Sequence, residues 1–264
     1  MSTPIELQAL LKRLHLATVL RKHADFEAQA AAEQWTHHEF LTRLLAEEVA
    51  NRAGTRITRK SHQAHFPYLK TIEEFDFTFQ SSIRRQQLGP FLGPELVSEG
   101  RNLILSGGSR RGKTHIAIAL AYRAIQNGYE ARFVTATALH LPNRGARRGR
   151  QQRRTTRGHR SLRAAPRTRH RPRRMKEVGY LQHANTAANV LYGVIDQRCL
   201  RKRPIILTTN KKLRQWGEVL HDPQLAEALL DRILERGQHI ALGGRSWRTK
   251  AIQESEGLAM EPSP

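Results

Sequence analysis

The segment NLILSGGSRRGKTHIAIALAYRAIQNG at residues 102–128 contains a strand, a glycine-rich turn and a helix in direct succession. Its apolar run at 102–106 ends at a glycine, which is typical of a strand buried in a parallel sheet. From residue 113 onward apolar residues recur at helical spacing, and Gly128 is the expected C-terminal cap. The expected inward face consists of Ile116, Ala119, Leu120 and Ala124. This order of elements predicts an α/β fold.

The turn itself matches the pattern G-x-x-x-x-G-K-[ST], which binds phosphate groups. Its members are Gly107, Gly108, Ser109, Arg110, Arg111, Gly112, Lys113 and Thr114. Consecutive backbone N–H groups must wrap the phosphates, so glycine is needed where a side chain would collide or where φ is positive. Lys113 would reach the β- and γ-phosphates, and Thr114 would offer its hydroxyl to Mg²⁺. The competing interpretation is an ordinary glycine-rich turn, but the flanking strand and helix favour phosphate binding.

Strands and helices continue to alternate after this segment. Further strands are predicted at 130–136, 204–210 and 239–244. Helical patterns occupy 185–200 and a segment opened by Asp222 and Pro223, a favourable pair for the N-cap and first helical positions. We therefore expect a P-loop domain at residues 67–264, with helices flanking a parallel sheet.

Residues 1–66 have a different pattern and predict a small helical domain. One helical face is expected to carry Leu7, Leu10, Leu11 and Leu14. Thr36 and Glu39 form a capping box at the start of a later helix, and Gly54 is the expected end of that helix.

A basic stretch without acidic residues surrounds that expected helix end. It contains Arg52, Arg56, Arg59 and Lys60. These side chains are candidates for contacts with the phosphate backbone of DNA. The alternative interpretation is a solvated connector between the two domains.

The charge of the chain is extreme, with a formal net charge of +22. Residues 140–176 hold fourteen arginines and one lysine and no acidic residue, so most of this excess comes from one segment. The segment has neither a helical nor a strand-like period, and its composition predicts disorder. An excess of this size indicates nucleic acid as a partner.

Other compositional features limit the cellular setting. A single cysteine, Cys199, excludes an intramolecular disulfide and is expected in a reducing compartment. No stretch approaches the ~18 consecutive apolar residues of a membrane span. We expect a cytoplasmic protein without a membrane partner.

Several stretches, taken in order, resemble the IstB-like ATPases, helper proteins of bacterial insertion-sequence transposition. This family is related to the DnaC-type helicase loaders within the AAA+ P-loop group. The resemblance covers most of residues 5–139 and 177–250. It is carried by LLKRLHLATVL, EFLTRLLAEEVANR, HFPYLKTIEEFDFTFQ, NLILSGGSRRGKTHIAIALAYRAIQNGYEARF, EVGYL, RPIILTTNKKLRQWGEVLHDPQLAEALLDRILERG and GGRSWRTK.

The resemblance implies roles for individual residues. Lys113 and Thr114 would contact the phosphates of ATP and Mg²⁺. Glu177 would be the Walker B glutamate that orients water, and Asn210 the sensor residue near the γ-phosphate. Arg232 is a candidate arginine acting in trans at a subunit interface. The family implies a homo-oligomer that assembles on DNA with ATP and delivers a transposase to its target.

Two positions depart from the family pattern. Arg110 occupies a position that is glycine in the family's loop, and Lys176 replaces the Walker B aspartate, a ligand of Mg²⁺. The strand expected before Glu177 reads RHRPRRM, in which proline removes a ladder donor and buried arginines would be costly. We therefore expect no central strand there, and we hypothesise that the arginine-rich segment is translated out of frame.

Three functions remain open from the sequence. The first is an ATP-binding helper of DNA transposition that recruits or activates a transposase, and the second is a helicase loader of the DnaC type. The third is a decayed family member that does not hydrolyse ATP and retains only electrostatic DNA binding.

The out-of-frame hypothesis makes a direct prediction about the gene. Translation of a GC-rich gene in a shifted frame typically gives an arginine-rich amino-acid sequence. Another reading frame across codons 135–180 should therefore encode an apolar strand that ends in Asp-Glu. Resequencing this stretch tests the prediction, and the hypothesis fails if no alternative frame encodes such a strand.

Overall fold

The computed structural model describes residues 6–135, 173–178, 184–244 and 246 of the 264-residue chain. The chain divides into two compact units, Met1–Lys60 and Ser61–Pro264. Among the described residues, no helix combines the length and apolar character needed to cross a lipid bilayer.

The first unit is helical. Its helices are α1 (Leu7–Arg13), α2 (Ala17–Glu33) and the first part of α3 (His37–Ala64). Its small core consists of Leu11, Val19 and Leu44. The predicted capping box is confirmed, because the Glu39 amide donates to Thr36 Oγ1 at 3.2 Å and the Thr36 amide donates to Glu39 Oε2 at 2.9 Å.

A buried carboxylate joins α2 to α3. Glu48 on α3 accepts hydrogen bonds from the first amides of α2, those of Thr18 at 2.8 Å and Val19 at 3.2 Å. Arg52 also donates to this carboxylate. Burial alone would raise the pKa of Glu48, but these hydrogen bonds outweigh burial and lower the pKa. An anion held at a helix N-terminus is stabilising, so Glu48 fixes the packing of this small unit.

Two expectations for the first unit are wrong. α3 continues through Gly54 to Ala64, because one interior glycine costs only about 1 kcal/mol and does not interrupt the helical hydrogen bonds. The predicted leucine face of α1 is also mostly not buried. Leu11 joins the core, whereas Leu7, Leu10 and Leu14 are exposed, because so small a unit has little interior to offer.

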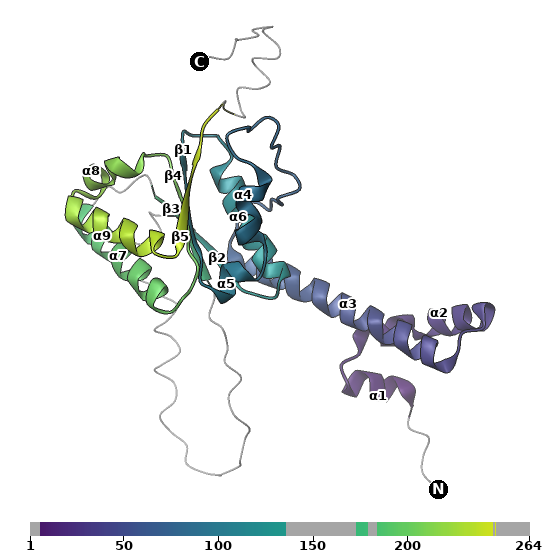
Figure 1. Ribbon diagram of the computed structural model, residues 1–264. Coiled ribbons are helices and arrows are strands. Elements are labelled where there is room, and N and C mark those ends of the chain that lie inside the picture. The colour runs from purple at the N-terminus through teal and green to yellow at the C-terminus, as the bar shows by residue number, and fades with distance from the viewer. Residues whose placement is uncertain (1–5, 136–172, 179–183, 245, 247–264) are drawn as a thin grey trace, which may run out of the picture. The chain divides into compact units, whose positions relative to one another are not determined.

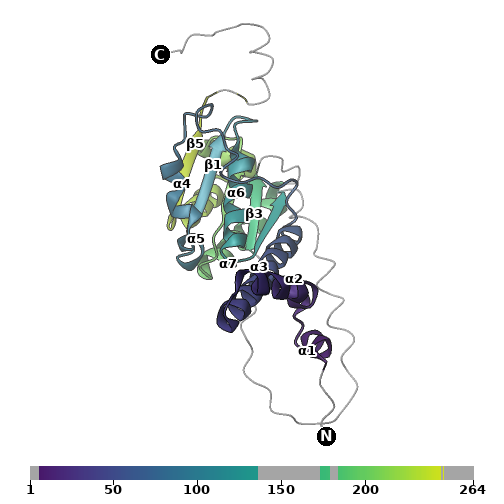
Figure 2. The same cartoon turned by 90° about the vertical axis from the view of Figure 1, so that its right-hand side faces the viewer.

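The second unit is built on a five-stranded sheet with the order β2-β3-β4-β1-β5 (Figures 1 and 2). All four neighbouring pairs are parallel. The strands are β1 (Asn102–Gly107), β2 (Ala131–Thr135), β3 (Arg173–Val178), β4 (Ile206–Thr209) and β5 (Gly237–Leu242). The predicted α/β class with a parallel sheet is therefore confirmed.

Helices cover both faces of the sheet. Figure 1 shows α7, α8 and α9 on one face and α4 and α6 on the other. The helices of this unit are α4 (Arg85–Leu92), α5 (Glu95–Ser98), α6 (Lys113–Gln126), α7 (Ala184–Leu200), α8 (Trp216–Leu220) and α9 (Pro223–Leu234), with a 3₁₀ turn η2 (Leu213–Gln215). Asp222 caps α9 as predicted, since its side chain accepts from the Leu225 amide at 2.9 Å.

The expectation that no central strand precedes Glu177 is wrong. Residues Arg173–Val178 form β3, which pairs with β2 on one side and β4 on the other. Pro172 lies before the first residue of the strand, so every residue of β3 keeps the amide needed for the ladder. The remainder of the predicted disordered segment, residues 140–172, lies outside the described residues.

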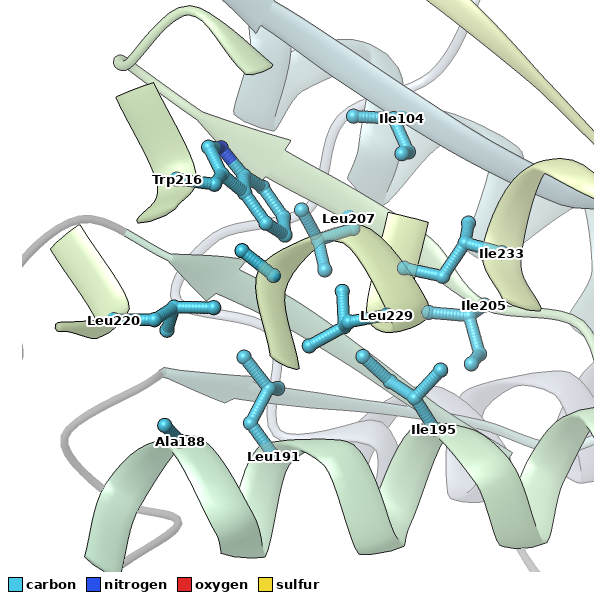
Figure 3. Packing of buried hydrophobic residues seen from close by; sticks show 11 residues of the cluster. Ile104, Ala188, Leu191, Ile195, Ile205, Leu207, Trp216, Leu220, Leu229 and Ile233 are labelled. Carbon is cyan, nitrogen blue, oxygen red and sulfur yellow. The ribbon is translucent and has the colours of Figure 1, made fainter. Parts of the chain in front are cut away.

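The core on the α7–α9 side joins the middle of the sheet to its helices. Figure 3 shows Ile104 of β1 and Leu207 of β4 packed with Trp216, Leu229 and Leu191. The Trp216 side chain is only 1% exposed. Because β1 and β4 contribute to the same core, the ends of these two strands are held in fixed positions.

A buried amide side chain fixes the beginning of β1. Asn102 donates to the Ile233 carbonyl at 3.0 Å and accepts from the Ile205 amide at 3.0 Å. These bonds connect β1 to the end of α9 and to the residue before β4. Buried polar groups left without such partners would cost about 1–3 kcal/mol each, so the side chain locks the strands in register.

Candidate phosphate-binding site

The glycine-rich loop lies between β1 and α6, as the sequence predicts. Gly107 has a φ of 140° and Gly112 a φ of 88°, both in the range that favours glycine. A Cβ at Gly107 would lie 2.2 Å from the Leu242 carbonyl oxygen, and one at Gly112 would lie 2.5 Å from the Phe75 ring. These two glycines are therefore required by backbone conformation and by close packing.

Arg110 adopts a left-handed conformation with a φ of 65°. This is the position at which the resembling family has glycine, so the loop keeps a glycine-like backbone although the residue is arginine. A non-glycine residue in this region costs about 1–2 kcal/mol. The loop therefore carries backbone strain at Arg110.

Lys113 is the first residue of α6, and its side chain is only 6% exposed. Its Nζ donates to the carbonyl oxygens of Gly107 at 2.8 Å and Gly108 at 2.7 Å. The ammonium group is thus held over the loop where a phosphate chain would lie. The amino end of α6 adds the positive end of a helix dipole at the same place.

A segment before β1 packs against the loop, and its residues are not among the functional residues that the sequence predicts. Phe75 lies against Gly112, and Gln80 Nε2 donates to the Arg111 carbonyl at 2.9 Å. His115, the second residue after Lys113, lies 2.9 Å from the Thr71 carbonyl. Burial lowers the pKa of His115, so the neutral ring can donate this hydrogen bond at neutral pH. The only signal in the sequence is the aromatic-rich run FDFTFQ at 75–80.

Asn210 immediately follows β4, the neighbour of β1. The register pairs Ser106 with Thr209, so the residues that follow these two strands start about 5 Å apart. Asn210 Oδ1 is buried and has no hydrogen-bond partner in the described part of the chain. The structure thus brings this predicted sensor residue next to the loop, with an unused polar atom.

Glu177 lies in β3 at the same edge of the sheet. Its backbone pairs with Thr208 of β4, which in turn pairs with Leu105 of β1. Two strand spacings separate Glu177 from β1, or about 10 Å. Lys176, at the expected position of the Walker B aspartate, precedes it in the same strand.

Arg232 is not brought to this site within one chain. It lies in the last turn of α9, beside the first residues of β1, whereas the loop follows the last residue of β1. Its side chain pairs with Asp196 at 3.4 Å and with Glu235 at 3.8 Å. The role of a trans-acting arginine stays a prediction.

The four predicted DNA-binding residues all lie on α3. The Arg52 side chain is engaged with Glu48 and with the carbonyl of His15. Lys60 is buried, with 9% of its side chain exposed, whereas Arg56 and Arg59 are exposed. Arg52, by its ion pair, and Lys60, by its burial, are therefore engaged within the protein itself.

The strain at Arg110 predicts the outcome of a substitution. Arg110→Gly should raise the free energy of unfolding by up to about 1 kcal/mol, since relief of the left-handed penalty exceeds the entropy that glycine adds to the unfolded chain. Ser109→Gly is the matched control and should lower stability, because Ser109 is not left-handed. Urea denaturation measures both, and equal effects would contradict the assignment of strain to Arg110.

Comparison with known proteins identifies the family. Residues 9–255 match the family described as IstB-like ATP binding protein. A relative from insertion sequence IS21 of Pseudomonas aeruginosa, named for ATP binding, is 32% identical over 259 residues, which cover 98% of this chain and 94% of the relative. A second, from IS5376 of Geobacillus stearothermophilus, is 32% identical over 249 residues, 92% of this chain and 94% of the relative.

Among solved structures, the crystal structure of DnaI has a TM-score of 0.46 and 16% identity, covering 67% of this chain and 89% of that chain. The sheet order confirms the predicted parallel α/β fold, with the glycine-rich loop between β1 and α6. The AAA+-like assignment stays a prediction. Because residues 9–255 match this family and two insertion-sequence relatives are each 32% identical, the chain belongs to the family of IstB-like ATP-binding proteins.

Proposed function

We propose that this protein binds ATP with Mg²⁺ at the loop 107–114 and uses the bound nucleotide to assemble on DNA as a helper of insertion-sequence transposition. The observation that carries the proposal is the loop itself, with Lys113 held against the loop carbonyls between β1 and α6. The family and the insertion-sequence origin of its relatives support transposition rather than helicase loading as the setting.

The residues of the loop 107–114 and Asn210 fit a nucleoside triphosphate. The positive φ of Gly107 and Gly112 lets the backbone turn tightly between β1 and α6, and backbone N–H groups are the natural ligands of phosphate in such a loop. Lys113 would exchange its two carbonyl partners for β- and γ-phosphate oxygens. Asn210, whose Oδ1 atom is buried at the neighbouring strand end, would lie near the terminal phosphate.

The fit to Mg²⁺ is less complete. Thr114 would supply one hydroxyl oxygen, and Glu177 is a carboxylate at the same edge of the sheet. The position of the expected carboxylate ligand holds Lys176, whose ammonium group repels a cation. When bound, Mg²⁺ would neutralise phosphate charge, and the triphosphate and water would supply the remaining ligands.

Two partners complete the proposal. The net charge of +22 suits binding to DNA, whose phosphates dominate the affinity of basic proteins. We further propose that the assembled homo-oligomer recruits a transposase, since the relatives come from insertion sequences. Arg232 would then act across a subunit interface.

Substitution of the loop lysine tests ATP binding. Lys113→Ala should weaken ATP binding about 10- to 150-fold, since hydrogen bonds to charged groups contribute about 1.5–3 kcal/mol. Lys202→Ala, which removes an exposed lysine before β4, should leave the Kd unchanged. Titration with a labelled ATP analogue and Mg²⁺ gives both values. Absence of saturable binding by the wild-type chain would refute the proposal.

A second candidate function is favoured by Lys176. A family member that binds ATP without hydrolysing it would still assemble on DNA, but it could not leave the ATP-bound state by hydrolysis. This candidate predicts a rate of ATP hydrolysis, with or without DNA, no higher than that of Lys113→Ala, and an increased rate for Lys176→Asp. A phosphate-release assay measures these rates. DNA-stimulated hydrolysis that Lys113→Ala abolishes would instead support the active helper.

A further inference from the structure

Three exposed cations lie within the four residues 211–214, shortly after the end of β4. Lys211, Lys212 and Arg214 are all exposed, and the loop between Asn210 and Gln215 contains no acidic residue. None of the three forms an ion pair with another described residue. We name these three side chains the β4 basic cluster.

The backbone beneath the β4 basic cluster is held firmly. The Lys211 amide donates to Thr209 Oγ1 at 3.1 Å, and the Lys212 amide donates to Gln215 Oε1 at 3.2 Å. Leu213 packs against the core cluster that contains Trp216, whose ring Figure 3 shows among the core residues. A ligand that binds the cluster therefore has little backbone to order, and this lowers the entropic cost of binding.

The cluster offers charge without an apolar anchor. Leu213, the only apolar residue between its members, is turned into the core. Protein interfaces usually centre on buried aromatic or aliphatic side chains, which this loop does not present. A polyanion bound through its phosphates needs only the cations. The chemistry of the cluster therefore fits a nucleic-acid backbone better than a protein partner.

The cluster also lies at the nucleotide edge of the sheet. β4 runs beside β1, and both Asn210 and the phosphate-binding loop follow the ends of these paired strands. Two basic residues predicted to contact DNA on α3 are used within the protein, Arg52 in an ion pair and Lys60 by burial. The side chains of the β4 basic cluster, by contrast, are exposed and form no ion pair with another described residue.

We propose that the β4 basic cluster, Lys211, Lys212 and Arg214, contacts the phosphate backbone of double-stranded DNA. This inference rests on the proposed function, in which the protein assembles on DNA. It adds a DNA contact at the edge of the sheet where ATP is proposed to bind, so nucleotide and DNA would occupy neighbouring loops. Lys211 of the cluster directly follows Asn210, the predicted sensor residue, in the sequence.

A charge-matched pair of variants tests the proposal in the full-length chain. The site variant is K211Q/K212Q/R214Q. The control is R201Q/K202Q/R203Q, which removes the same number of charges from the loop before β4, at the opposite edge of the sheet. Binding to a labelled DNA duplex is followed by fluorescence anisotropy between about 50 and 200 mM salt, the range over which phosphate contacts change affinity strongly.

The site variant should lose about 2–3 units from the slope of log K against log salt, because each phosphate contact contributes about 0.9. The slope of the control should differ from the wild-type slope by no more than about 0.9, the contribution of one phosphate contact. Equal losses in the two variants, or an unchanged slope in the site variant, would overturn the proposal. Titration with polyglutamate covers the protein alternative: weakened binding of polyglutamate by the site variant, with DNA binding intact, would also overturn it.

The outcome separates this inference from the proposed function. Both variants should retain the wild-type Kd for ATP, which also confirms that the α/β unit is folded. If the wild-type chain binds ATP but no DNA, the proposed assembly on DNA fails. If wild type and control bind DNA and the site variant behaves like them, only the role of the β4 basic cluster fails.

Discussion

The pairing of β1 with β4 on one side and β5 on the other is the constraint on which the site depends. Ser106 is level with Thr209, and Gly107 is level with Leu242. All three strands are parallel, so their carboxyl ends meet at one edge, where the loop, Asn210 and the end of β5 lie together. Asn102 fixes the opposite end through hydrogen bonds to Ile233 and Ile205. A slip of one residue would turn every side chain of β1 to the other face of the sheet and separate these groups.

The sequence predicts this centre well because its signals are local. The strand, the turn and helix α6 are encoded in 102–128, and the capping residues Asp222 and Thr36 act on their own helices. The prediction failed at β3, where hydrogen bonds to neighbouring strands determine the structure. β3 forms from arginine-rich residues because a strand in the middle of the sheet gains backbone hydrogen bonds from both neighbours, and no local pattern reports that gain. Gly54 failed as a helix end for a similar reason, since surrounding helical bonds outweigh one weak helix former.

Roles that depend on contacts remote in sequence could not be predicted either. The sequence cannot show that Glu48 holds the Thr18 amide, that Phe75 lies on Gly112, or that Gln80 holds the Arg111 carbonyl. Each contact joins segments tens of residues apart. The sequence does show the three cations of the β4 basic cluster. Their exposure, however, becomes evident only from the structure, in which Leu213 and Trp216 pack in the core.

The hydrogen bonds of Lys113 have a consequence for which anions the loop accepts. Before any ligand enters, the ammonium group already has two carbonyl partners, and both must be given up. Charge-assisted bonds of this kind contribute about 1.5–3 kcal/mol each, so an incoming anion must offer comparable bonds in return. A lone inorganic phosphate can offer few. In the proposed function, a chain of linked phosphates would also engage the loop amides and the helix dipole. The carbonyl-bound lysine would then select anions by their number of linked phosphates and disfavour small cellular anions.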